Sequence, residues 1–153
     1  LDAFGETGTS ASRDRGAGFA EGIKAYPGIK IAAQQTANFD RAEALNVATN
    51  LLQANPGVTG IFAENDEMAL GAIQALGSRA GTEVSVVGFD GTEGGFTAIQ
   101  NGTMTATIAQ QPAELGKRSV EVLAQLLDGE TVEATIPVPV TTVNADNVAD
   151  FAS

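Results

Sequence analysis

Five residues that follow apolar stretches of this chain could together bind a small polar molecule. They are Arg13, Phe39, Asn65, Asp90 and Gln110. A carboxylate accepts hydrogen bonds, a guanidinium donates them and an amide does both, so the set can satisfy hydroxyl groups, which are donors and acceptors at once. The ring of Phe39 could cover an apolar C–H face. These side chains suit a small neutral polyol such as a sugar.

Each of these residues taken singly also has a simpler explanation. Each could have a purely structural role: Asp90 and Gly91 can simply form a turn, Asn65 can cap a helix, and Phe39 can pack on its own helix. Asp66, one residue further on, is assigned here to the cap of that same helix. The site hypothesis is favoured because the carboxyl ends of parallel strands meet at one rim of a sheet, where ligands bind in open α/β folds.

Alternating strands and helices must bring those residues together. Apolar, β-branched runs predict strands at 1–4, 29–35, 58–63, 83–90, 103–109 and 136–143. Helical periodicity between them, with a capping box at Asp40 and Glu43 and a proline start at Pro112, predicts the intervening helices. The fold class is α/β, with a mainly parallel sheet flanked by helices on both faces. The run 83–91 is expected to be buried on both faces.

Composition excludes several functions. The 153 residues predict one domain with a real core, and a net charge of −11 disfavours nucleic acid and anionic membranes as partners. The chain has no Cys and no His, so thiolate chemistry, His-based catalysis and most zinc sites are excluded, and we expect no catalytic residue, metal or cofactor. The chain opens inside an apolar run, Leu1 to Phe4, which predicts a fragment of a longer protein.

Several segments resemble one family of proteins. They are GTSASRDRG at 8–16, NFDR at 38–41, FAENDEMALGA at 62–72, VVGFDG at 86–91 and TATIAQ at 105–110. These segments are similar to the carboxyl-terminal half of bacterial ribose-binding proteins, the periplasmic receptors of sugar ABC importers. The resemblance implies one lobe of a type 1 periplasmic binding protein that binds a pentose, most simply D-ribose, without catalysis. It implies a sugar site made of Arg13, Phe39, Asn65, Phe89, Asp90 and Gln110.

The same resemblance implies a division of the chain. Residues 1–110 would form the sugar-binding carboxyl-terminal lobe, residues 111–135 the hinge crossing and a helix of the missing amino-terminal lobe, and residues 136–153 a returning strand and tail. The full-length protein would be periplasmic and would deliver sugar to a membrane permease. Without its lobe, the helix at 112–128 would keep an exposed apolar face, and we expect it to pair with a second copy in a homodimer.

Two other functions remain open at this point. The effector domain of a lactose-repressor-type transcriptional regulator shares the fold and would bind a similar ligand. A small α/β enzyme using Asp90 or Asp66 as a base is disfavoured, because the sequence offers it no nucleophile and no metal cluster.

Overall fold

The chain folds around one six-stranded sheet. A computed structural model describes residues 2–4 and 8–151. Within them the strands stand in the order β2-β1-β3-β4-β5-β6. Neighbours from β2 to β5 are parallel, and β6 is antiparallel to β5. The strands are β1 (Asp2–Phe4), β2 (Gln34–Thr36), β3 (Gly60–Ala63), β4 (Ser85–Asp90), β5 (Ala106–Ala109) and β6 (Thr141–Asn144). The predicted α/β class with a mainly parallel sheet is confirmed.

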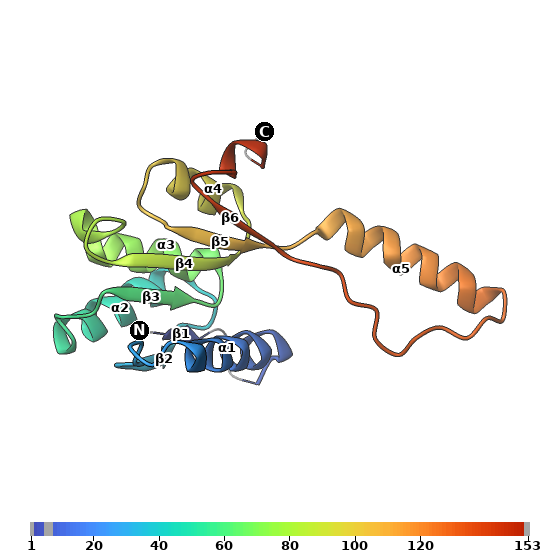
Figure 1. Cartoon of the computed structure of the whole chain (residues 1–153), viewed down its shortest axis with the longest axis horizontal. Helices are drawn as coiled ribbons and strands as arrows, with labels where there is room; N and C mark the ends of the chain where they lie inside the picture. Colours follow the sequence, from blue (N-terminus) through green and yellow to red (C-terminus); the bar gives the residue numbers. More distant parts are fainter. Residues whose placement is uncertain (1, 5–7, 152–153) are drawn as a thin grey trace.

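Helices follow the strands (Figure 1). They are α1 (Ser10–Gly22), α2 (Arg41–Ala54), α3 (Asp66–Leu76), α4 (Glu93–Gln100) and α5 (Pro112–Leu127), with short 3-10 turns at Ile23–Ala25, Gly77–Arg79 and Val148–Asp150. Each of the first four helices begins after a capping residue: Thr9, Asp40, Asn65 and Thr92. The side chain of each cap accepts a hydrogen bond from the backbone N–H three residues further along the chain. Such caps start each helix soon after a strand ends, so polar loop residues stand at one rim. No helix among the described residues has both the length and the hydropathy needed to span a membrane.

One face of the sheet carries the core. Residues facing α2, α3 and α4 alternate with residues on the other face, and the buried set includes Ile61, Val86 and Ala109. Helix α3 approaches β4 closely because Gly88 has no side chain: a Cβ there would lie 3.3 Å from Ala69 Cβ and would overlap the Asp66 carboxylate. The core therefore depends on a glycine in the middle of a strand.

Gly88→Ala is expected to destabilise the chain. The added methyl has no space, so we expect a loss of roughly 1 to 3 kcal/mol in unfolding free energy. Gly18→Ala is the control, because it lies inside α1 with nothing within 4 Å of its added Cβ, and helix propensity predicts a gain of about 0.5 to 1 kcal/mol. Urea unfolding of both variants measures the contrast. Equal effects of the two substitutions would contradict the close packing of α3 on β4.

The other face is only partly covered. Phe19 of α1 stacks on Phe62 of β3 with ring centroids 4.7 Å apart, but along β4 Ser85 is exposed and Val87 is half-buried. The expectation that the run 83–91 is buried on both faces is therefore wrong, because α1 reaches only the β1 and β3 side of this face. The uncovered part forms a groove.

Two strand predictions also need correction. The strand expected at 29–35 is β2, which is shorter and lies at Gln34–Thr36. The strand expected at 136–143 begins only at Thr141. Pro137 and Pro139 have no N–H to donate, so the sheet ladder forms after them.

Helix α5 projects away from the sheet at one end of the molecule (Figure 1). We call residues 111–140 the arm. Its two ends leave the sheet side by side, because Ala109 pairs with Thr141 at the edge of the β5–β6 ladder. None of the described α5 residues is buried. Within residues 2–4 and 8–151, helix α5 therefore adds no side chain to the buried core.

Candidate functional site

The carboxyl ends of β3, β4 and β5 bring most of the predicted site residues together. Asn65 caps α3 just after β3, Asp90 ends β4 and Gln110 follows β5 directly. Gln110 Nε2 donates to Asp90 Oδ1 at 2.7 Å, and Asn65 Nδ2 donates to the backbone oxygen of Phe39 at 3.3 Å. Four side chains that are distant in sequence thus stand at one rim.

The structure brings Arg15 to this rim, and not Arg13, which the sequence predicted. Arg13 is 68% exposed and pairs with its neighbour Asp14. Arg15 stands two residues further along α1, about 200° around the helix, and points to the sheet. It lies on the inner face with Ser12, Gly16 and Phe19. The spacing of these inner positions is the sequence signal that distinguishes Arg15 from Arg13.

Arg15 is held by contacts on several sides. Its Nη1 donates to the backbone oxygen of Glu64 at 2.7 Å, and its Nη2 lies 3.1 Å from Asp90 Oδ1. The guanidinium carbon lies 3.9 Å from the ring centroid of Phe89 and 5.9 Å from that of Phe39. A planar guanidinium between a carboxylate and aromatic faces is well oriented and still has donors to spare. We call Arg15, Phe39, Asn65, Phe89, Asp90 and Gln110 the rim cluster.

The surroundings of Asp90 disfavour its charge. Burial raises the pKa of this carboxyl, while the charge of Arg15 and the hydrogen bond from Gln110 lower it, and the nearby Asp66 raises it. The balance leaves the pKa above its ordinary value. A half-buried carboxylate gains from further hydrogen bonds, so Asp90 is well suited to accept them from a ligand.

Backbone strain gathers at the same place. Among the described residues, the non-glycine positions with positive φ are Asn38, Phe39 and Asp90, at 50°, 59° and 112°. Residues other than glycine adopt such backbone angles at a cost of about 1 to 3 kcal/mol each. Residues strained in this way are concentrated at functional sites. Here the strain orients the Phe39 ring and the Asp90 carboxylate.

Asp66 does not cap α3, in contrast to its assignment from the sequence. The cap is Asn65, whose Oδ1 accepts from Met68 N at 2.8 Å. Asp66 is fully buried, and its Oδ2 accepts from Thr92 N at 2.7 Å and from Thr92 Oγ1 at 3.0 Å. Its Oδ1 accepts from Thr107 Oγ1 at 2.6 Å. Asp66 therefore ties α3 to β5 and to the loop that follows Asp90.

Comparison with known proteins places the chain in a family of binding proteins. Residues 3–131 match the periplasmic binding protein domain, and the chain belongs to this family. It is 48% identical to the ribose import binding protein RbsB of Salmonella typhimurium over 138 residues, which are 90% of this chain and 46% of that protein. It is 50% identical to RbsB of Haemophilus influenzae over 134 residues, 88% of this chain and 45% of that protein.

Solved structures give the same result. The periplasmic solute-binding protein of an ABC transporter from Actinobacillus succinogenes, with bound D-allose, superposes with a TM-score of 0.91 at 33% identity. The match covers 97% of this chain and 53% of that one. The chain thus spans about half the length of the curated relatives that it matches, and these relatives are sugar-binding transport proteins by name.

Proposed function

We propose that the chain is the carboxyl-terminal, sugar-binding lobe of a solute-binding protein of a bacterial ABC importer, and that its ligand is D-ribose. The observation that carries the proposal is the rim cluster, in which an acceptor carboxylate, a guanidinium, two amides and aromatic rings converge on one spot. The names of the relatives favour ribose import over the effector domain of a regulator, and binding over catalysis. The periplasm and a membrane permease as partner belong to the same proposal.

The cluster can bind a sugar hydroxyl in a specific way. Arg15 and Gln110 both contact Oδ1 of Asp90, so among the described residues Oδ2 is left to accept from a ligand hydroxyl. Arg15 has five N–H donors and can donate to the same hydroxyl or its neighbour. Phe39 would lie against the C–H face of the sugar. A sugar with one hydroxyl inverted would leave buried groups unpaired at about 1 to 3 kcal/mol each, which gives the site its selectivity.

One lobe supplies only part of the contacts. We propose that residues 1–110 form the binding lobe, that residues 111–135 cross to a second lobe, and that residues 136–153 return from it. Water would reach a sugar held by a single lobe, so we expect this chain alone to bind D-ribose weakly. Residues 112–128 are proposed to contact a second copy when no second lobe covers them.

The test compares two arginines of the same helix. In a 15N NMR titration with millimolar D-ribose, we expect shifts at the rim cluster. Arg15→Ala should weaken binding roughly 10- to 100-fold, because a charged donor is worth about 1.5 to 3 kcal/mol. Arg13→Ala is the control and should bind as the original chain does, since Arg13 is exposed and points elsewhere. An effect of Arg13→Ala that exceeds that of Arg15→Ala, or no rim shifts at all, would contradict the proposal.

A further inference from the structure

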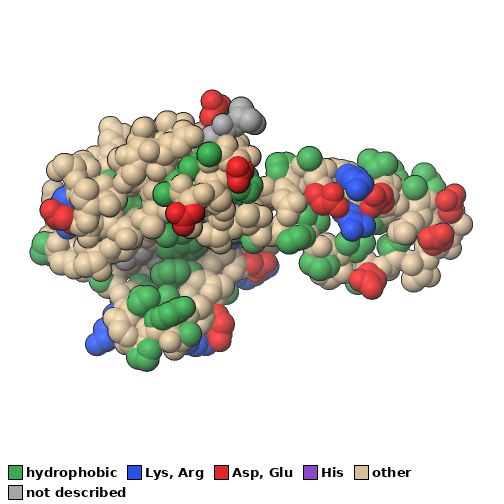
Figure 2. Space-filling view, turned by 45° about the horizontal axis from the view of Figure 1, so that its top comes forward, with side chains coloured by type: hydrophobic (Ala, Val, Ile, Leu, Met, Phe, Trp, Pro, Cys, Tyr) green, Lys and Arg blue, Asp and Glu red, His purple; other side chains and the backbone are tan. Residues whose placement is uncertain are grey.

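One buried carboxylate adjoins the rim cluster without belonging to it. Figure 2 shows acidic side chains dispersed over the surface of the molecule, whereas Asp66 is fully buried. Burying a carboxylate is unfavourable unless hydrogen bonds compensate for the lost water. Asp66 has three such bonds: its Oδ2 accepts from N and Oγ1 of Thr92, and its Oδ1 accepts from Oγ1 of Thr107. A buried polar group with this many partners fixes the segments that it joins.

The three segments that meet at Asp66 each present one member of the rim cluster. Asn65 directly precedes Asp66, Asp90 stands two residues before its partner Thr92, and Gln110 stands three residues after its other hydroxyl partner. These segments are the start of α3, the turn after β4 and the strand β5. One carboxylate therefore sets how three parts of the rim lie relative to one another.

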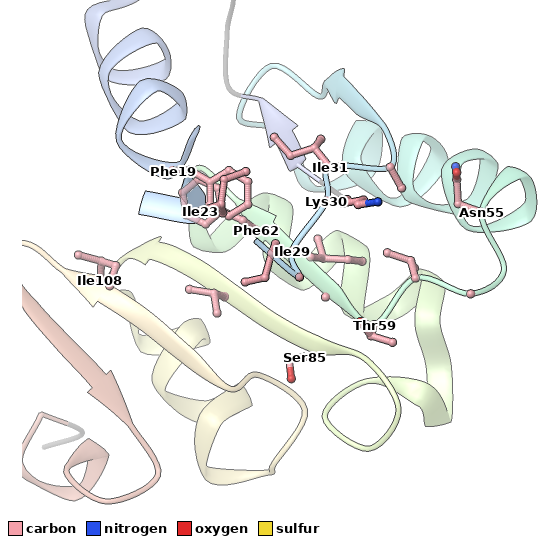
Figure 3. A pocket seen from close by; sticks show the side chains of 17 residues that line it. Phe19, Ile23, Ile29, Lys30, Ile31, Asn55, Thr59, Phe62, Ser85 and Ile108 are labelled. Atoms are coloured by element: carbon pink, nitrogen blue, oxygen red, sulfur yellow. The ribbon is translucent and has the colours of Figure 1, made fainter. Parts of the chain in front are cut away.

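The sequence leaves room for this carboxylate on the core face of the sheet. A Cβ at Gly88 in β4, or at Gly95 in α4, would overlap it. Thr107 turns its hydroxyl to the same face, because its neighbour Ile108 lines the groove on the opposite face (Figure 3). The network is therefore enclosed by α3, α4 and the sheet, and it lies apart from the groove.

The backbone between this network and the sugar site is strained. Asp90 has a φ of 112° and Gly91 a φ of 76°. A residue other than glycine keeps such an angle only where its surroundings enforce it. On one side, Gln110 N donates to the backbone oxygen of Asp90 at 3.1 Å. On the other side, Thr92 N donates to the Asp66 carboxylate at 2.7 Å. The strained pair is thus held at both ends, and one end depends on Asp66.

The hydroxyl of Thr92 adds a second contact with a defined direction. Its Oγ1 accepts from Gly95 N at 3.1 Å, which caps α4. A hydroxyl has one proton, so that proton is left to donate to Asp66 Oδ2 at 3.0 Å. The same side chain therefore begins α4 and fastens the turn after β4 to α3.

We propose that Asp66 is a positioning residue for sugar binding. Through Thr92 it holds the turn after β4 in the conformation that directs the Asp90 carboxylate to the ligand. Asp66 acts without touching the sugar, because it is fully buried and both of its oxygens are engaged. The inference rests on the proposed function, in which Asp90 accepts from a sugar hydroxyl. Asp66 also stabilises the fold, so its test needs a readout that stability alone does not move.

NMR of the 153-residue chain provides two such readouts. The three-bond coupling between the amide and α protons of Asp90 reports its φ without any sugar, and a D-ribose titration reports the affinity of the folded molecules. Thr92→Val places a methyl group against the carboxylate. The Asp90 coupling should change, and ribose binding should weaken about 3- to 10-fold, the range of one hydrogen bond. Asp66→Ala should have the same effects, and Thr92→Val carries the test if Asp66→Ala does not fold.

Conservative variants and a matched control separate positioning from stability. Thr92→Ser keeps the hydroxyl, and Asp66→Asn keeps an oxygen that accepts from Thr92, so both should retain the Asp90 coupling and the ribose affinity of the original chain. Thr103→Val is the control. Its hydroxyl donates to the backbone oxygen of Ala98 at 3.1 Å before β5 begins, at the end of that strand away from the rim. Thr103→Val should lower stability but leave the coupling and the affinity unchanged.

The outcomes distinguish this inference from the proposed function. An unchanged Asp90 coupling in Thr92→Val, or a loss of ribose affinity no larger than that of Thr103→Val, would overturn the positioning role of Asp66. An original chain that shows no ribose shifts at the rim would instead contradict the proposed function. In that case the coupling, which needs no sugar, would still decide whether Asp66 holds the turn.

Discussion

Asp90→Asn is expected to weaken D-ribose binding roughly 10- to 100-fold while leaving the unliganded chain at least as stable as before. The loss follows because hydrogen bonds to a charged acceptor are worth about 1.5 to 3 kcal/mol, and the amide removes the charge. The retained stability follows because burial, the largest influence on this carboxyl, already raises its pKa. Where a charge is unfavourable in the folded state, its removal does not destabilise that state.

The pH dependence has a defined sign. Because the folded-state pKa of Asp90 lies above the unfolded value, the folded chain binds the proton more tightly. This group's contribution to the unfolding free energy is therefore most favourable below the ordinary aspartate pKa. It declines as the pH rises to the raised folded-state pKa, and it is constant above that. Ribose binding should follow the opposite course and strengthen as the carboxylate ionises.

Urea unfolding of the original chain and of Asp90→Asn across this pH range provides the measurement, together with ribose titrations. The stability of the original chain relative to Asp90→Asn should fall with rising pH. Asp146→Asn is the control, since it removes the same charge from an exposed site outside the cluster. A large loss of stability in Asp90→Asn at neutral pH would show that its contacts with Arg15 and Gln110 outweigh its burial, in contradiction to this prediction.

Asp66→Ala should lower the unfolding free energy by roughly 2 to 6 kcal/mol. The substitution leaves the backbone N–H of Thr92 and the hydroxyl of Thr107 without their acceptor, at about 1 to 3 kcal/mol for each buried donor. A domain is typically stable by only about 5 to 15 kcal/mol, so this loss can unfold part of the population at room temperature. Asp66→Asn should lose less, because its amide can still accept from Thr92 and donate to the Thr107 oxygen.

The matched control is the next residue. Glu67→Ala removes an acid from the same first turn of α3, but Glu67 is about half exposed and pairs with Arg41 across the surface at 2.8 Å. Exposed ion pairs contribute about 0 to 1 kcal/mol, so the control should change stability by that amount or less. Thermal and urea unfolding compare the variants. Equal losses in Asp66→Ala and Glu67→Ala would mean that Asp66 acts only through the helix terminus.

The sequence by itself determined the fold class and the rim. Local periodicity and caps are properties of short segments, so the order of strands and helices could be predicted, and parallel strands necessarily bring their carboxyl ends to one edge. For this reason Asn65, Asp90 and Gln110 were found from position alone. The resemblance of segments such as VVGFDG at 86–91 to ribose-binding proteins led to the family that the comparisons confirm.

Only the tertiary structure decided which residues meet. Which of Arg13 and Arg15 faces the sheet depends on how α1 is rotated about its axis. The two side chains lie about 200° apart around the helix, and residue type does not reveal which one points inward. The partners of Asp66 lie 26 and 41 residues away, and they become visible only when α3, α4 and β5 are packed. The position of α1 is decided in the same way: Phe19 stacks on Phe62 of β3, while Ser85 of β4 stays exposed. Contacts between distant segments depend on packing, and the local sequence does not encode them.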